Sequence, residues 1–172
     1  MTRSVEVVIA DTSPLIALAR LEALPLLAAL FARVWVTETV LAECLAGIDR
    51  SECASIRAAV DAGQLSVCQA PAAHPSWGVD DGEASAIAAA LELGAGVVMD
   101  DRAGRQAALR LGLPVIGALG VLVLAKRSGL VPEVRPLVAA LVDSGYYLAE
   151  SVIKDALRLA GESSPVASEN PS

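Results

Sequence analysis

The sequence predicts an α/β fold, a three-layer α/β/α sandwich around a central, mainly parallel sheet of four or five strands. Short valine-rich runs alternate along the chain with longer, alanine-rich segments of helical periodicity. The chain is 55% hydrophobic but only 3% aromatic, so its core must consist of aliphatic side chains. Its 172 residues suit one domain. We place that domain at residues 1–161 and expect a disordered tail at 162–172, where apolar periodicity ends.

Apolar runs and turn residues define the elements of the first half. A hydroxyl of Thr12 or Ser13 is expected to cap the first helix, with Pro14 near its first turn, and Thr37 can cap a later one. Prolines should keep the loop at 70–79 free of regular structure. The expected strands are 5–10, 34–37 and 65–69, and the expected helices are 14–31 (divided at Pro25), 38–46 and 51–62.

Glycines placed just after periodic segments mark the ends of helices in the second half. Asp80 or Asp81 is expected to cap the helix that Gly94 ends. The expected strands are 96–99 and 114–117, and the expected helices are 82–93, 102–111, 119–128, 133–143 and 149–160.

Acidic residues follow two of these strands. Asp11 comes directly after VVIA, and the pair Asp100 and Asp101 comes after GVVM. Because the carboxyl ends of parallel strands share one edge of a sheet, these residues should lie close together. Carboxylates gathered there repel one another unless a divalent cation holds them, and ligands that are all oxygen favour Mg²⁺ or Mn²⁺. For Asp11 we prefer a metal ligand to a helix cap.

Two glutamates on the predicted helices are further candidates. Glu43 lies at the boundary of a buried helix face, and Glu83 shares an inward face with Ile87. Each has an ordinary alternative, since Glu43 suits a solvated helix surface and Glu83 suits the first turn of a helix. Glu38 and Asp81 are weaker candidates for the same roles.

Asp100 and Asp101 are adjacent, so their side chains should point in different directions. One of them can face the site while the other caps the next helix or pairs with Arg102 or Arg105. The sequence leaves open which one does so.

Composition excludes other kinds of site. A net charge of −7 by itself argues against a nucleic-acid binder, unless bound metal cancels several carboxylates. Three cysteines without CxxC spacing and a single histidine fit neither a disulfide framework nor a zinc site. The sequence shows no signal peptide and no uninterrupted membrane span, so we expect a cytoplasmic protein without membrane contact.

Taken in order, these motifs resemble the PIN-domain nucleases, in particular the small prokaryotic group related to VapC-type toxins. The resemblance covers about residues 5–160. Its motifs are Asp11-Thr12-Ser13-Pro14-Leu15-Ile16, Glu43, Gly82-Glu83-Ala84, Asp100-Asp101-Arg102 with Arg105, and the stretch from Gly117 to Arg127. Two positions depart from the common pattern: Glu83 stands where many members have Asp, and Met99 stands where Thr is commoner.

The resemblance implies a PIN-like fold and a Mg²⁺- or Mn²⁺-dependent endoribonuclease. It also implies a homodimer that acts as the toxin of a toxin–antitoxin pair and is inhibited by a small antitoxin protein. It assigns the catalytic and metal-binding acids to Asp11, Glu43, Glu83 and Asp101, with Asp100 as the alternative to Asp101 and with Thr12 and Ser13 in support.

RNA contact needs local positive charge, for which the candidates are Arg102, Arg105, Lys126 and Arg127. Trp35 and Trp77 could stack on bases, but packing in the core is at least as good an interpretation. An alternative function is a catalytically inactive module of the same fold whose acidic edge binds a basic partner. A phosphatase of the haloacid-dehalogenase type is disfavoured, because Ser13 stands where a second Asp is needed.

Overall fold

The computed structural model of the protein describes residues 5–47 and 50–162. Its strands are β1 (Val7–Ala10), β2 (Arg33–Thr37), β3 (Ser66–Cys68), β4 (Gly96–Val98) and β5 (Val115–Ile116). Its helices are α1 (Thr12–Arg20), α2 (Pro25–Leu30), α3 (Glu38–Leu45), α4 (Ser51–Asp61), the short 3₁₀ helix η1 (Pro75–Trp77), α5 (Asp81–Leu93), α6 (Arg102–Arg110), α7 (Ala118–Arg127), α8 (Arg135–Asp143) and α9 (Glu150–Leu159).

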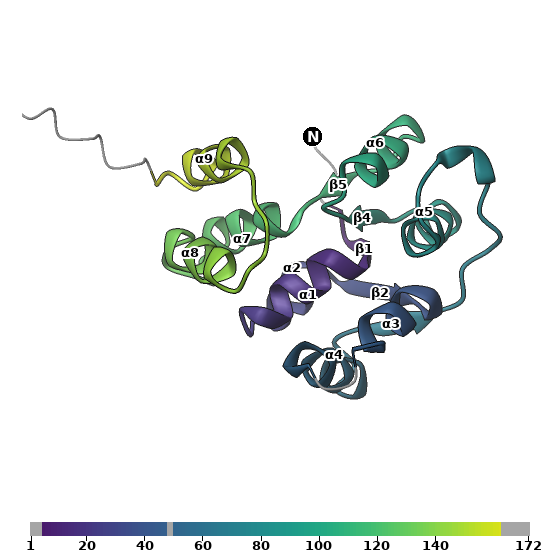
Figure 1. Ribbon diagram of the computed structural model, residues 1–172, viewed down its shortest axis with the longest axis horizontal. Coiled ribbons are helices and arrows are strands. Elements are labelled where there is room, and N and C mark those ends of the chain that lie inside the picture. Colours follow the sequence, from purple (N-terminus) through teal and green to yellow (C-terminus); the bar gives the residue numbers. More distant parts are fainter. Residues whose placement is uncertain (1–4, 48–49, 163–172) are drawn as a thin grey trace, which may run out of the picture.

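The five strands form one parallel sheet in the order β3-β2-β1-β4-β5. Figure 1 shows α5 and α6 on one side of this sheet and α1, α2 and α7 on the other. Helix α5 packs against β1, β2 and β4, and α6 packs against β5. The predicted three-layer α/β/α fold is confirmed.

The strand order places a topological switch between β1 and β4. From β1 the chain adds β2 and β3 on one side, then returns to add β4 and β5 on the other. At the carboxyl end of this central pair, the backbone N–H of Asp11 donates to the carbonyl of Val98 at 2.9 Å. In open parallel sheets such a switch opens a crevice between the diverging loops, where ligands bind.

The core is aliphatic, as the composition predicts. The central strands contribute Ile9 and Val97, and the flanking helices contribute Leu15, Leu27 and Ile87, all of which are fully buried. Burial of side chains of this kind stabilises a fold by roughly 1.5–3 kcal/mol each. A rigid sheet of this kind fixes the ends of β1 and β4 relative to each other.

The predicted helix caps have mixed outcomes. Thr37 accepts a hydrogen bond from the backbone N–H of Val40 at 3.1 Å, which confirms it as the cap of α3. The prediction that Thr12 or Ser13 caps the first helix is wrong, because α1 begins at Thr12 and Asp11 holds the N-cap position. The Asp11 side chain makes no capping hydrogen bond either.

Two predicted segments differ from the structure. The helical segment expected at 14–31 is divided at Pro25, as predicted, into α1 and α2, but it begins at Thr12 and not at Pro14. The loop at 70–79 is not wholly irregular, because His74 caps the single turn of η1. Proline fits there because the first position of a helix needs no backbone N–H.

The last described residue, Glu162, is held against the folded domain. Its carboxylate accepts hydrogen bonds from Lys126 Nζ at 3.1 Å and from the backbone N–H groups of Val134 at 2.8 Å and Arg135 at 3.0 Å. The rest of the predicted tail, residues 163–172, lies outside the described residues. Within the described parts of the chain, no helix is long and apolar enough to cross a membrane.

Candidate active site

Asp11 lies at the centre of the candidate site. It follows the central strand β1 directly, and only 4% of its surface is exposed. Burial first, and then the negative charges of Asp80, Glu43 and Asp100, raise the pKa of its carboxyl to about 7, against the lowering effect of one backbone hydrogen bond from Thr12. A carboxyl group in this position is costly to ionise without a nearby positive charge.

Glu43 reaches the same place from α3. Its Oε2 atom accepts a hydrogen bond from the Thr12 hydroxyl at 2.7 Å, so the first turn of α1 orients it. Its carboxylate also lies against Gly82 at the start of α5, where a Cβ atom would lie 2.7 Å from Oε1. Glycine at position 82 therefore makes room for this carboxylate.

A buried pair of hydroxyl groups holds α3 and α5 together beneath Glu43. Thr37 Oγ1 and Ser85 Oγ lie 2.7 Å apart, and the Ser85 hydroxyl is 2.8 Å from the carbonyl of Gly82, to which it donates. Since Thr37 also caps α3, this contact fixes the start of one helix to the start of the other. The positions of Glu43 and Gly82 are tied together in this way.

Glu83 is buried in the first turn of α5, with 7% of its surface exposed. Its backbone N–H donates to Asp80 Oδ1 at 2.8 Å, and its carboxylate accepts from the backbone N–H of Asp80 at 3.3 Å, which forms a capping box. Burial raises the pKa of Glu83 to about 7, with further contributions from the charges of Asp80, Asp101 and Asp11. Glu83 therefore lies in the first turn of the helix, as its ordinary alternative predicts, and it also lies close enough to the other acids to be affected by their charges.

The structure separates the roles of Asp100 and Asp101. Asp101 is exposed and caps α6, since its Oδ2 atom accepts from the backbone N–H of Gly104 at 3.0 Å. Asp100 turns toward α7, where Oδ1 accepts from the backbone N–H of Ala118 at 2.8 Å. Among the ion pairs of the described residues, none joins Asp100 or Asp101 to Arg102 or Arg105, so the structure does not show the ion-pair alternative. Asp101 raises the pKa of Glu83, and Asp100 raises that of Asp11.

Tyr146 is a site residue that sequence reasoning missed. Its hydroxyl donates to Asp100 Oδ2 at 2.7 Å, so both oxygens of Asp100 have donors. Burial and the charge of Asp100 raise the pKa of Tyr146 far above its ordinary value, which keeps the hydroxyl protonated. Tyr146 lies 46 positions away in a segment without helix or strand, and no local pattern could have predicted this contact.

Asp80 is the second residue whose role the sequence understated. It was expected only as a cap, and it does cap α5. Its charge also raises the pKa of both Asp11 and Glu83, and it does so more strongly than the charge of any other residue. The acidic edge therefore includes Asp80.

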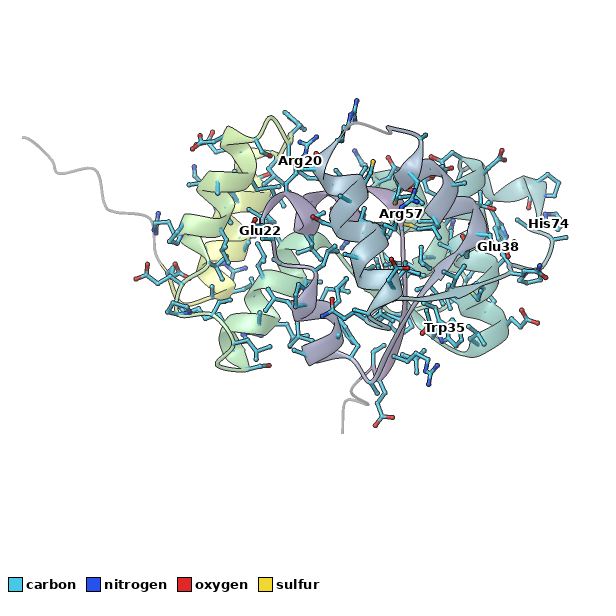
Figure 2. All side chains as sticks on the ribbon, turned by 90° about the horizontal axis from the view of Figure 1, so that it is seen from below. Arg20, Glu22, Trp35, Glu38, Arg57 and His74 are labelled. Atoms are coloured by element: carbon cyan, nitrogen blue, oxygen red, sulfur yellow. The ribbon has the colours of Figure 1, made fainter. Side chains whose placement is uncertain are left out.

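Ion pairs and nucleophilic side chains contribute little at this edge. None of the ion pairs seen among the described residues involves one of the candidate acids. Cys44 is buried beside Asp11 and Glu43, and burial followed by these charges raises the pKa of its thiol to about 12. His74 is exposed and caps η1, where its Nδ1 atom accepts from the backbone N–H of Ser76 at 3.2 Å, and Figure 2 shows it at the outer end of the molecule. Imidazole and thiolate chemistry are therefore not placed at this edge.

The residues predicted to contact RNA lie in two places. Arg102 and Arg105 are on α6, next to the acids, and Arg105 Nη1 donates to the carbonyl of Met99 at 2.8 Å. Lys126 and Arg127 are at the far end of α7, where they contact Glu162 and the carbonyl of Leu159. Lys126 lies eight positions along α7 from Ala118 at the site, a distance of roughly 12 Å.

The two tryptophans pack against the core. Trp35 packs against the core from β2, with the Arg33 guanidinium 5.3 Å from the centre of its ring. Trp77 is half-buried against the core at the end of η1. Both fit the packing interpretation.

The chemistry of the donor set fits a hard divalent cation. Asp11, Glu43, Glu83, Asp100 and Asp101 offer carboxylate oxygens alone, which suit Mg²⁺ or Mn²⁺. As arranged here, no group of three or more His, Cys, Asp or Glu side chains in residues 5–47 and 50–162 is positioned to hold an ion. The carboxylates of Glu83, Asp100 and Asp101 each accept a hydrogen bond from a backbone N–H group, and these bonds account for part of the distance between the acids.

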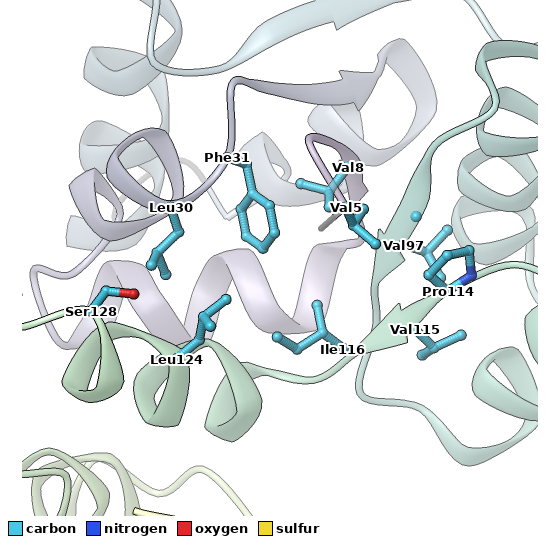
Figure 3. A pocket seen from close by; sticks show the side chains of 11 residues that line it. Val5, Val8, Leu30, Phe31, Val97, Pro114, Val115, Ile116, Leu124 and Ser128 are labelled. Carbon is cyan, nitrogen blue, oxygen red and sulfur yellow. The ribbon is translucent and has the colours of Figure 1, made fainter. Parts of the chain in front are cut away.

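An apolar cavity of about 280 Å³ lies at the opposite edge of the sheet (Figure 3). It is lined by residues at the starts of the strands, including Val5 and Pro114, and by Phe31 and Leu124 from the helices. No acidic side chain lines it. It therefore plays no part in the acidic site.

Comparison with protein families agrees with this geometry. The model of the family DUF3368, described as a PIN domain, matches residues 7–162. No curated protein matches the sequence. PIN domains are generally nucleases and typically use divalent metals. Because the match spans nearly all of the described residues, this chain belongs to the DUF3368 family of PIN domains.

Proposed function

We propose that this protein is a Mg²⁺- or Mn²⁺-dependent endoribonuclease that cleaves RNA phosphodiester bonds with a metal-activated water. The observation that carries the proposal is the gathering of acids from four elements at the central switch of the sheet. Asp11 follows β1, Glu43 comes from α3, Glu83 from α5, and Asp100 with Asp101 from the end of β4. Membership of a family of nucleases supports the same reaction class.

The metal would be held by Asp11, Glu43 and Glu83, with Asp100 or Asp101 as a fourth ligand. A bound divalent cation supplies a water of lowered pKa and stabilises charge that develops on the phosphate. The protein's own residues position the acids: Thr12 orients Glu43, and Gly82 leaves space for it. Buried acids that repel one another also favour the binding of a cation over that of a neutral ligand.

Cleavage of a labelled single-stranded RNA by the purified protein tests this proposal. Wild type with Mn²⁺ should cleave, whereas EDTA or the Asp11→Asn substitution should abolish cleavage. The matched control is Asp143→Asn on α8, the same change at an exposed site, which should cleave like the wild type. Cleavage that persists both in EDTA and in the Asp11→Asn variant would contradict the metal-dependent mechanism.

The biological role that we propose is the toxin of a toxin–antitoxin pair, acting as a homodimer and inhibited by a small antitoxin protein. The support is the resemblance of the ordered motifs to VapC-type toxins. Expression of the wild type should arrest bacterial growth, and expression of Asp11→Asn should not. Growth arrest by both proteins would contradict the toxin role. A monomer in light scattering would contradict the homodimer.

One observation favours a second candidate, an inactive module that binds a basic partner through the acidic edge. The carboxylates of Glu83, Asp100 and Asp101 already have donors within the protein. A module of this kind needs no metal. The absence of Mn²⁺ binding and of RNA cleavage, together with binding of a Lys- and Arg-rich peptide, would favour it.

A further inference from the structure

A groove of about 960 Å³ begins at the acidic site and runs along α6. Asp100, Arg102 and Arg105 line it at the end near the site, and Leu109, Tyr147 and Val152 line it farther along. Its opposite wall is the start of α7 and the segment that leads into α9. Any polymer bound in this groove would pass directly beside Asp100.

The wall of the groove formed by α6 is positively charged. This helix carries Arg102, Arg105 and Arg110 and no acidic residue, in a protein with a net charge of −7. Arg102 is exposed and forms no ion pair among the described residues. The bond from Arg105 to the carbonyl of Met99 fixes its guanidinium near Gly117, at the end of the groove by the site.

Tyr147 supplies an exposed aromatic ring in the same groove. It is 87% exposed, and its exposed apolar neighbours along the groove are Leu109 and Val152. The adjacent Tyr146 is anchored through Asp100, so the backbone that carries Tyr147 is attached to the acidic site. An exposed ring beside arginines is the combination that binds single-stranded nucleic acid, because bases stack on the ring and phosphates contact the guanidinium groups.

We propose that this groove binds the single-stranded RNA substrate next to the point of cleavage, with Tyr147 stacking on a base and Arg102 and Arg105 contacting phosphates. The proposal rests on the ribonuclease function proposed above. The charge of α6 and the continuity with Asp100 favour RNA over an apolar peptide as the occupant. Tyr147 would then influence which bases the enzyme prefers near the cut.

Fluorescence anisotropy with a labelled ten-nucleotide RNA tests the groove separately from catalysis. The parent protein carries Asp11→Asn, so binding is measured in Mg²⁺ without cleavage, and a gel verifies that the RNA stays intact. Adding Tyr147→Ala or Tyr147→Leu should weaken binding about tenfold, whereas Tyr147→Phe should retain it because the ring remains. Melting temperatures of these variants should match that of the parent, since Tyr147 is exposed.

Arginine variants test the charge contribution. Arg102→Gln should weaken binding several-fold and reduce the slope of log K against log salt by about 0.7, the value for one phosphate contact on a single strand. The matched control is Arg57→Gln, the same change on the exposed surface of α4 (Figure 2), which should leave affinity and slope unchanged.

The outcomes separate this proposal from the proposed function. If the wild type cleaves RNA but Tyr147→Ala and Arg102→Gln bind like the parent, the groove proposal is wrong and the nuclease stands. If the substitutions weaken binding but the wild type does not cleave RNA, the proposal of RNA binding in the groove is supported and the proposed ribonuclease function is wrong. Equal loss with Tyr147→Phe and Tyr147→Ala would overturn the stacking role.

Discussion

Replacing Asp11 with asparagine should stabilise the metal-free protein at alkaline pH. The folded-state pKa of this carboxyl is about 7, against an ordinary value of 3.8, because of burial first and then the charges of Asp80, Glu43 and Asp100. A raised pKa of this kind favours folding at low pH, and that contribution is lost as pH rises through 7. Asparagine has a similar shape, does not ionise, and is equally suited to the N-cap position.

The size of the effect follows from proton linkage. For a folded pKa near 7 and an unfolded pKa near 3.8, the Asp11 carboxyl lowers the free energy of unfolding by about 2 kcal/mol at pH 5 and by about 4 kcal/mol at pH 8. The second figure is an upper bound, because Glu83 and the other acids titrate together with Asp11. The Asp11→Asn advantage should therefore grow by a few kcal/mol between these two pH values.

Urea unfolding in EDTA at pH 5 and pH 8, followed by circular dichroism, measures this difference. The control Asp143→Asn changes an exposed side chain and should alter stability by no more than about 0.5 kcal/mol at either pH. If Asp11→Asn is less stable than the wild type at pH 8, or if its advantage is equal at both pH values, the argument from burial and repulsion is wrong.

Three further substitutions test contacts at the site. Gly82→Ala should displace the Glu43 carboxylate, since the new Cβ would lie 2.7 Å from Oε1. RNA cleavage should then fall at least tenfold while the far-UV circular dichroism spectrum is retained. Unchanged cleavage would show that the position of Glu43 is not needed for the reaction. Tyr146→Phe removes the donor to Asp100 Oδ2 and should cost about 1.5–3 kcal/mol in urea unfolding, and a cost near zero would contradict the contact. Gly117→Ala would place a Cβ 2.7 Å from Asp100 Oδ1 and should lower stability by about 1–3 kcal/mol, so an unchanged melting temperature would refute the close approach.

The layered fold and the central acid could be predicted from the sequence because both depend on local patterns. Valine-rich runs specify buried parallel strands, and Asp11 follows such a run directly. The strand-end argument therefore placed Asp11 beside the end of β4, where the structure has it. The resemblance to PIN domains supplied Glu43 and Glu83, whose positions in the helices have ordinary explanations.

The details of the acidic edge depend on contacts between distant segments, which a single sequence does not reveal. Which of Asp100 and Asp101 caps α6 was decided by the path of the chain to Ala118 and Tyr146. Thr12 was expected either to cap the first helix or to support a ligand carboxylate, and its hydroxyl has the second role, since it donates to Glu43, 31 positions away. The charge of Asp80 acts on Asp11 because α5 packs against β1, whereas it acts on Glu83 within the first turn of the same helix.

Isothermal titration of Mn²⁺ into the purified protein tests the central claim most directly, that the acids at the switch point bind a divalent cation. The account predicts binding in the millimolar range or tighter for the wild type and for Asp143→Asn, and its loss in Asp11→Asn. Because a carboxylate must be ionised to bind the cation, binding should also weaken from pH 8 to pH 5, as Asp11 and Glu83 gain protons. No binding to the wild type, or binding that Asp11→Asn leaves unchanged, would contradict the account.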